Sequence, residues 1–268
     1  MDNILDITPK DSIDKFFSKI SEFRNIDQIE LKDLAGQMVK GYSGHPDYSH
    51  IKDNELEKIW YKSLDRGIPD YSVYNTDIYI SDLWACWIMY SRKYLREIRK
   101  PKNNIIDNKI SYKKIVDLGC GFGYTTIALK QMFPDAEVIG TNIKGTTQID
   151  VARSLGVDYN FKIVSDYKKI GNGVDLIFAS EYFEHFPEPV KHLEDIICST
   201  QAKYFLFANS FGTKSVGHFN EYIIKDRIVG GRSASTLFNK VLKINGYTNI
   251  KTQMWNNKPS YWGYRYEA

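Results

Sequence analysis

The hydrophobic pattern divides the chain into two parts. Up to about residue 108, apolar positions recur with the spacing of amphipathic helices, which are predicted over residues 13–23, 26–39, 53–64 and 77–99. From residue 113, short apolar runs alternate with helix-length segments, a pattern typical of a parallel sheet covered by helices. We therefore expect a mostly helical segment over residues 1–108 and an α/β domain over residues 109–268.

The second part contains enough elements for a seven-stranded sheet. Its end predicts a β-hairpin, because residues 248–254 and 261–266 flank the turn residues Asn256-Asn257-Lys258-Pro259. The other predicted strands are residues 115–118, 137–141, 161–164, 175–179 and 204–208, and the predicted helices are residues 124–132, 147–155, 188–199 and 233–245.

The most informative stretch is residues 115–126, where a buried strand ends in three glycines spaced two apart and a helix follows at once. Glycine allows a tight turn and a close approach to a ligand, and a helix N-terminus offers unpaired N–H groups. The spacing D-x-G-x-G-x-G, with Asp117 in the strand end, differs from the dinucleotide and P-loop patterns. On these residues alone, a tight strand-to-helix turn without a ligand is the alternative.

This stretch resembles motif I of the class I S-adenosylmethionine-dependent methyltransferases, whose loop holds the methionine part of the cofactor. The order of elements in residues 113–266 is also similar to that family. The resemblance implies a Rossmann-like, doubly wound, seven-stranded and mainly parallel sheet with an antiparallel last strand.

Ligands of open α/β sheets bind at the carboxyl ends of the strands, so the residues that follow each strand matter most. After the second strand the family usually has an acid for the ribose. Here Asn142 stands there, followed by Gln148, as is familiar in the small-molecule branch of the family. After the third strand, Asp166 and Tyr167 match the family's adenine position. For Asn142, the alternative to ribose binding is that it only begins a turn.

After the fourth strand, residues 179–189 resemble the family's E-H-x-x-x-P segment. The resemblance places Glu181 at the methionine end and Glu184 and His185 towards the acceptor. His185 is the candidate base, because its ordinary pKa is near neutrality, with Glu184 as its partner. Alternatively the Glu-His pair only holds the loop. His218, after the fifth strand, is expected at the rim of the acceptor pocket.

These readings give one set of candidate site residues. The predicted catalytic residues are His185, Glu184 and His218, and the predicted cofactor-binding residues are Asp117, Gly119, Cys120, Gly121, Gly123, Asn142, Gln148, Asp166, Tyr167 and Glu181. We expect no metal site, because the isolated histidines His45 and His50 lie in a polar loop.

Composition says more about the cellular compartment of the protein than about its function. The chain has 268 residues, a formal net charge of +3 and three widely spaced cysteines, which indicate neither a disulfide framework nor a metal pair. We find no signal peptide and no membrane-spanning run, and expect a cytoplasmic protein without a membrane partner. Nine basic residues between Arg92 and Lys114 face two acids, which fits either phosphate contacts or a solvated helix face.

The leading hypothesis is methyl transfer from S-adenosylmethionine to a small-molecule acceptor. In it, residues 109–268 bind the cofactor and the helical residues 1–108 form the lid or acceptor wall. The base-methylating motif [DNS]-P-P-[YF] and a Pro-Cys nucleophile are absent from the sequence. A nucleic-acid or nucleotide methyltransferase stays open as one alternative, and a cofactor-binding protein without transfer activity as another. The sequence does not specify the acceptor or the oligomeric state.

Overall fold

The computed structural model describes residues 10–45, 47, 54–98, 112–250 and 259–265. The expected domain boundary near residue 108, His50 and the turn at residues 256–258 lie outside the described residues. Within them, no helix is long and apolar enough to cross a membrane.

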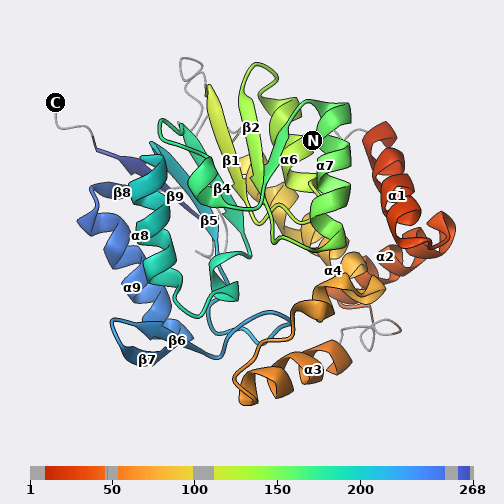
Figure 1. Cartoon of the computed structure of the whole chain (residues 1–268), viewed down its shortest axis with the longest axis horizontal. Coiled ribbons are helices and arrows are strands. Elements are labelled where there is room, and N and C mark those ends of the chain that lie inside the picture. Colours follow the sequence, from red (N-terminus) through yellow and green to blue (C-terminus); the bar gives the residue numbers. More distant parts are fainter. Residues whose placement is uncertain (1–9, 46, 48–53, 99–111, 251–258, 266–268) are drawn as a thin grey trace.

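A seven-stranded sheet forms the centre of the molecule, with strand order β3-β2-β1-β4-β5-β9-β8 (Figure 1). Strands β1 to β5 are parallel, and β9 runs antiparallel to both of its neighbours, which confirms the predicted fold class. The order reverses at β1, whose neighbours are β2 and β4, and this is where open α/β sheets bind ligands. The strands are β1 (Lys114–Leu118), β2 (Glu137–Thr141), β3 (Lys162–Val164), β4 (Leu176–Ser180), β5 (Tyr204–Ala208), β8 (Tyr247–Ile250) and β9 (Pro259–Tyr264).

Helices cover both faces of the sheet, so the central strands are buried on both sides (Figure 1). Alternate residues of β1 enter different cores: Ile115 packs with Phe122 and Leu155, whereas Val116 packs with Leu193 and other residues on the opposite face. The helices of this part are α6 (Tyr124–Met132), α7 (Thr147–Tyr159), α8 (Pro189–Thr200) and α9 (Gly231–Ile244).

The N-terminal segment is helical, as predicted, and packs onto the α6–α7 side of the sheet. The ring of Phe16 stacks on Tyr124 at a centroid distance of 3.8 Å, and α1 contacts α7. Its elements are α1 (Lys10–Arg24), α2 (Gln28–Tyr42), α3 (Asn54–Asp65), the 3-10 helix η3 (Tyr71–Asn75), α4 (Asp77–Cys86), the π-helical turn η4 (Trp87–Ser91) and α5 (Arg92–Ile98).

The predicted continuous helix over residues 77–99 contains a feature that the sequence pattern did not show. Its middle turn, η4, is π-helical, a wide turn that is often found at functional sites. At its end, Ser91 Oγ lies 2.9 Å from Oγ of Ser180 at the end of β4. This contact thus joins the N-terminal segment to the carboxyl end of the central strand β4.

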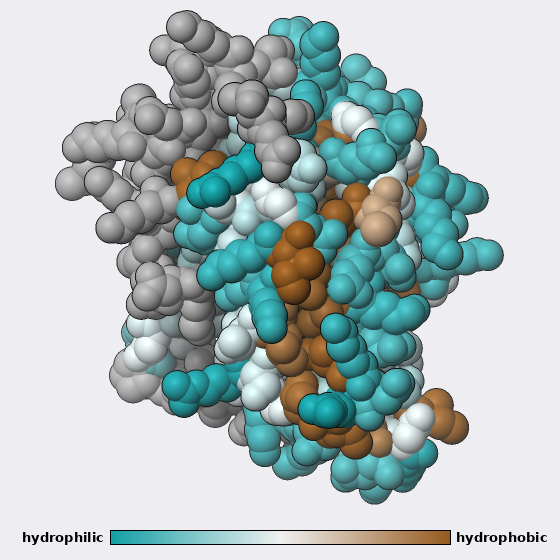
Figure 2. Space-filling model, turned by 90° about the vertical axis from the view of Figure 1, so that its left-hand side faces the viewer, coloured by the Kyte–Doolittle hydropathy of each residue, from teal (hydrophilic) through white to brown (hydrophobic). Residues whose placement is uncertain are grey.

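A small hairpin was not predicted. Strands β6 (Glu221–Ile224) and β7 (Arg227–Gly230) form an antiparallel pair. Lys225 and Asp226 form the turn between them, and both have positive φ. Two positive φ values are typical of a type I′ turn, but the usual Asn-Gly or Asp-Gly signal is missing here. Figure 2 shows this side of the molecule, where apolar residues form a band between polar ones. In this hairpin, the exposed residues Ile223 and Ile228 face each other across the two strands.

Candidate active site

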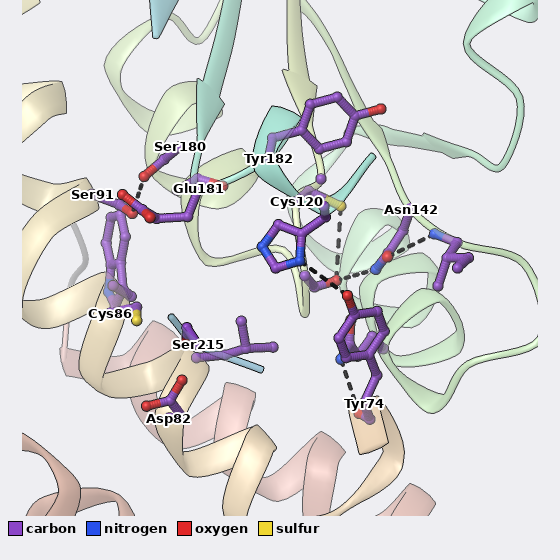
Figure 3. Close-up of a pocket in the computed structure, with 18 of the residues that line it drawn as sticks. Tyr74, Asp82, Cys86, Ser91, Cys120, Asn142, Ser180, Glu181, Tyr182 and Ser215 are labelled. Atoms are coloured by element: carbon purple, nitrogen blue, oxygen red, sulfur yellow. Dashed lines mark hydrogen bonds between the residues drawn. The ribbon is translucent and has the colours of Figure 1, made fainter. Parts of the chain in front are cut away.

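A cavity of about 780 Å³ lies at the carboxyl ends of β1, β2 and β4. Its volume is within the range of roughly 300–1,000 Å³ that is usual for small-molecule sites. The strand ends form one wall and the N-terminal segment forms the other, with labelled residues of both around one space in Figure 3. The tyrosines that the N-terminal segment contributes are Tyr42, Tyr71, Tyr74, Tyr79, Tyr90 and Tyr94.

The glycine loop after β1 lines the cavity with Gly119, Cys120 and Gly121. Thr141, at the end of β2, holds it: its hydroxyl accepts the N–H of Gly119 at 3.1 Å and its carbonyl accepts the N–H of Cys120 at 2.9 Å. Gly119 has φ +69°, and a Cβ there would overlap the ring of Tyr182. Only glycine therefore fits this position. Gly123 lies further on, as the N-cap of α6, and is not part of the cavity wall.

Asp117 lies beneath this loop with 1% of its surface exposed. One carboxylate oxygen accepts hydrogen bonds from the hydroxyls of Thr125 and Thr126, in the first turn of α6. Burial raises the pKa of Asp117 to about 7, against the opposing effect of the two hydroxyls. The acid thus fastens the start of α6 to β1, a positioning role beside the cofactor contact that the sequence suggested.

Asn142 and Gln148 both line the cavity, and both also have partners within the protein. Asn142 donates from Nδ2 to the carbonyl of Gly121 at 2.6 Å and accepts the N–H of Ile143 at Oδ1. Gln148 donates from Nε2 to the carbonyl of Tyr74 at 3.0 Å. Asn142 therefore shapes the glycine loop, and Gln148 attaches the N-terminal segment to α7.

The end of β3 leads to an aromatic group that sequence reasoning missed. Asp166 caps η6 (Tyr167–Lys169) and accepts the N–H of Lys168, while Tyr167 packs edge-on against His192. His192 stacks on Phe186 with centroids 4.1 Å apart, and its Nε2 lies 2.9 Å from the hydroxyl of Tyr182. Burial lowers the pKa of His192 to about 4. These four rings form an uncharged aromatic cluster that begins at the residue after Asp166.

The loop after β4 brings two predicted acids together. Glu181 has φ +51°, an uncommon backbone conformation for a residue with a side chain, and Glu184 lies in η7 (Phe183–His185). The Glu184 side chain is 0% exposed, and its Oε1 accepts the N–H of Ser210 at 2.7 Å. Burial and the neighbouring Glu181 carboxylate raise the pKa of Glu184 well above its ordinary value. Glu181 lines the cavity, whereas Glu184 lies behind it.

His185 lines the cavity together with His218, and their rings meet edge to face at a centroid distance of 4.8 Å. Its Nδ1 lies 3.0 Å from the hydroxyl of Tyr74, in place of the expected partner Glu184, which binds Ser210. Burial and the nearby His218 lower the pKa of His185 well below 6.5, so that its ring is neutral at pH 7. A neutral imidazole at a cavity wall can accept a proton from a bound molecule.

The family model described as a methyltransferase domain matches residues 110–257, more than half of the chain. This match includes strands β1 to β5 and β8 of the sheet and the strand ends that line the cavity. The chain belongs to the class I S-adenosylmethionine-dependent methyltransferases.

Curated relatives of this methyltransferase are similar over part of their length. A tRNA U34 carboxymethyltransferase of Campylobacter jejuni is 29% identical over 125 residues, 45% of this chain and 39% of the relative. A trans-aconitate 2-methyltransferase of Rhodopseudomonas palustris is 30% identical over 84 residues, 31% and 33% of the two chains. A ubiquinone biosynthesis O-methyltransferase of Stutzerimonas stutzeri is 31% identical over 122 residues, 41% and 50% of the two chains. The chain thus spans half or less of the length of these relatives.

Among solved structures, the magnesium protoporphyrin IX methyltransferase of Synechocystis has a TM-score of 0.44 and 14% identity, covering 80% of this chain and 99% of that one.

The individual residues by which the N-terminal segment contacts the methyltransferase site are what sequence reasoning did not identify. Tyr74 reaches His185, and Trp60 Nε1 donates to the carbonyl of His218 at 2.7 Å. On the same wall, Tyr42 donates to Asp82 Oδ1 at 2.6 Å (Figure 3 shows Asp82 beside Cys86). A surplus of tyrosine was visible in the sequence, but no motif connected residues 42–94 with the strand ends.

Proposed function

We propose that the protein transfers the methyl group of S-adenosylmethionine to a small-molecule acceptor. The observation that carries this proposal is the cavity itself, which has cofactor-type strand ends on one wall and the protein's own helical segment on the other. A sulfonium methyl group is already activated, so the protein has to align the acceptor with the S–CH₃ bond and exclude water. A wall made by the same chain suits an acceptor small enough to be enclosed.

The cofactor would extend along the strand ends. Asp166 and the aromatic cluster around His192 suit the adenine, because Asp166 offers a hydrogen-bond acceptor and the rings offer apolar contacts to a planar base. Asn142 suits the ribose: each of its side-chain polar groups has one partner in the protein and keeps capacity for a second. Gly119 and Glu181 suit the methionine end, because both line the cavity there and Gly119 lets the backbone approach a ligand closely.

The proton of the acceptor would go to His185. Its lowered pKa keeps the ring uncharged, and the hydroxyl of Tyr74 fixes the orientation of the ring. His218 lies beside it and completes the histidine pair. We propose His185 as the base and His218 as part of the acceptor wall, with Glu184 holding the loop from behind through Ser210.

Residues of the N-terminal segment would act as lid and acceptor wall, with a boundary to the cofactor domain near residue 108. Hydrogen bonds join the two parts on both sides of the cavity, through Gln148 and Tyr74 and through Ser91 and Ser180. We also propose a reducing compartment such as the cytoplasm, because Cys86, Cys120 and Cys198 are all free thiols.

A transfer assay tests the proposed function. The protein is incubated with methyl-labelled S-adenosylmethionine and either the small-molecule fraction or the RNA fraction of a cell extract. We expect label in the small-molecule fraction, and its loss in His185→Ala. Label in neither fraction, with the cofactor nevertheless bound, would leave the third reading, a cofactor-binding protein without transfer activity.

A nucleic-acid acceptor is the second candidate, favoured by the similarity to the tRNA carboxymethyltransferase. The basic run gives it less support than the sequence suggested, because Arg92 at its start is buried over the ring of Trp87. A gel shift at low salt decides between the two candidates: retarded tRNA would favour this second one.

A further inference from the structure

We propose that Glu181, Glu184 and His218 bind a divalent transition-metal cation at the inner end of the cavity. The expectation from the sequence was that the chain holds no metal site. The structure, however, brings one ligand atom of each of these residues within 4.8 Å of the others. Two carboxylate oxygens and one imidazole nitrogen in such a group are a common set of protein ligands for a first-row cation.

The cluster depends on folding and has no local sequence motif. Glu181 follows β4 in a left-handed backbone conformation, and Glu184 comes three residues later in the short 3-10 helix η7. His218 is more than thirty residues away, in the loop that leads to β6. The N–H of Phe219, the next residue, donates to the carbonyl of Glu184 at 3.3 Å and brings this loop against η7.

The second observation is a buried carboxylate oxygen that receives no N–H or O–H donor from the described residues. Glu184 Oε1 accepts the N–H of Ser210, whereas Oε2 is buried without such a donor and has the Glu181 carboxylate as its neighbour. An unpaired buried carboxylate beside a second carboxylate is costly, because both lose hydration and repel each other. A cation between Glu181 and Glu184 removes both costs at once.

The third ligand is presented in the required tautomer. His218 donates from Nδ1 to the carbonyl of Thr213 at 2.9 Å, so the neutral ring has its lone pair on Nε2. A backbone carbonyl that fixes the free ring nitrogen is the usual support of a metal-bound histidine. Trp60 holds the backbone of His218 through its hydrogen bond to the His218 carbonyl. His218 is only 5% exposed.

Three protein ligands leave coordination positions open. Glu181 and His218 line the cavity, so the open positions face the space in which an acceptor would lie. A cation there would bind an oxygen of the acceptor and lower the pKa of a hydroxyl group, a preference for oxygen acceptors that rests on the proposed methyl transfer. The binding of the cation itself does not depend on that function.

Titration of Mn²⁺ into the EDTA-treated chain of residues 1–268, followed by the loss of the free Mn²⁺ signal in electron paramagnetic resonance, tests the site. We expect one bound Mn²⁺ per chain, with binding at least about tenfold weaker in Glu184→Gln and in the less buried variant Glu181→Gln. The exposed Glu188→Gln serves as the matched control and should bind like the wild type.

Thermal unfolding of both glutamate variants is recorded beside the titration, so that weaker binding caused by a folding defect is recognised. Stoichiometric binding that is lost in both variants supports the site. A wild type that binds neither Mn²⁺ nor Zn²⁺, or variants that bind as tightly as the wild type, would overturn it, and the two acids would then share a proton. Calorimetry with S-adenosylmethionine on the same samples separates failure of the metal site from failure of the proposed function.

Discussion

The hydroxyl of Tyr74 lies 3.0 Å from Nδ1 of His185 and joins the N-terminal segment to the loop after β4. The contact is tight, since Gly217, with φ +84°, packs so closely that a Cβ there would overlap both groups. The contact between Tyr74 and His185 links the candidate base to a residue that lies in no recognisable sequence motif. The helical segment is thus part of the site and more than a cover.

Replacing this tyrosine tests the link. In Tyr74→Phe the ring stays and the hydroxyl is lost, so His185 loses the group that orients it. We expect kcat for methyl transfer to fall by about tenfold or more, the order of a displaced acid–base group, with little change in the affinity for S-adenosylmethionine. Tyr159→Phe, on α7 outside the cavity wall, is the control. Equal rates for Tyr74→Phe and wild type would refute the role.

Asp117 gives a pH dependence of stability whose sign is fixed by its pKa. The folded-state pKa of about 7 is higher than that of the unfolded chain, near 4, so the folded state binds more protons between these values. This contribution to the free energy of unfolding is complete below pH 4 and is lost as the pH rises through 7. We expect Asp117→Asn to gain stability relative to wild type over that window.

Chemical denaturation at several pH values measures this difference. The exposed Asp135→Asn provides the matched control, and its difference from wild type should change far less with pH. A difference between wild type and Asp117→Asn that is constant from pH 4 to pH 8 would show that Asp117 titrates at an ordinary carboxyl pKa.

His192 gives the opposite sign. Its folded-state pKa of about 4 lies below that of the unfolded chain, about 6.5, so the unfolded state binds more protons in between. Its contribution to stability is present above pH 6.5 and is lost as the pH falls through 4. In His192→Phe the stack on Phe186 is retained, and we expect the variant to lose less stability than wild type on acidification. An NMR titration of the His192 ring with a midpoint near 6.5 would contradict this.

The sequence allowed the sheet to be predicted well because its strands are short apolar runs with clear ends. The bounds of β2, β5 and α6 agree with the predicted ranges, and the neighbouring elements shift by one or two residues, except that α7 extends to Tyr159. The hairpin β6–β7 was missed because Lys225 and Asp226 adopt a turn that usually contains glycine. The π turn at Trp87–Ser91 was missed because a single wide turn leaves the apolar pattern almost unchanged.

The site residues predicted from the sequence lie at a strand end or in the segment that follows one. Asp117, Asn142, Asp166 and Glu181 lie within two residues of a strand end, and all of them line the cavity. Tyr74 lines the same cavity and contacts His185, and the buried Trp60 supports the backbone of His218. Both contacts join residues more than a hundred positions apart, which no local pattern encodes. The approach of His218 to the two glutamates has the same origin.

The central claim is that the glycine loop binds S-adenosylmethionine, and calorimetric titration of two alanine variants tests it most directly. In Gly119→Ala a Cβ enters a loop with φ +69° and overlaps the Tyr182 ring, whereas Gly36→Ala adds the same atom to an exposed position with open space around it. We predict binding to the wild type and to Gly36→Ala, and at least about tenfold weaker binding to Gly119→Ala. Absence of binding to the wild type, or equal affinity for all three proteins, would contradict the account.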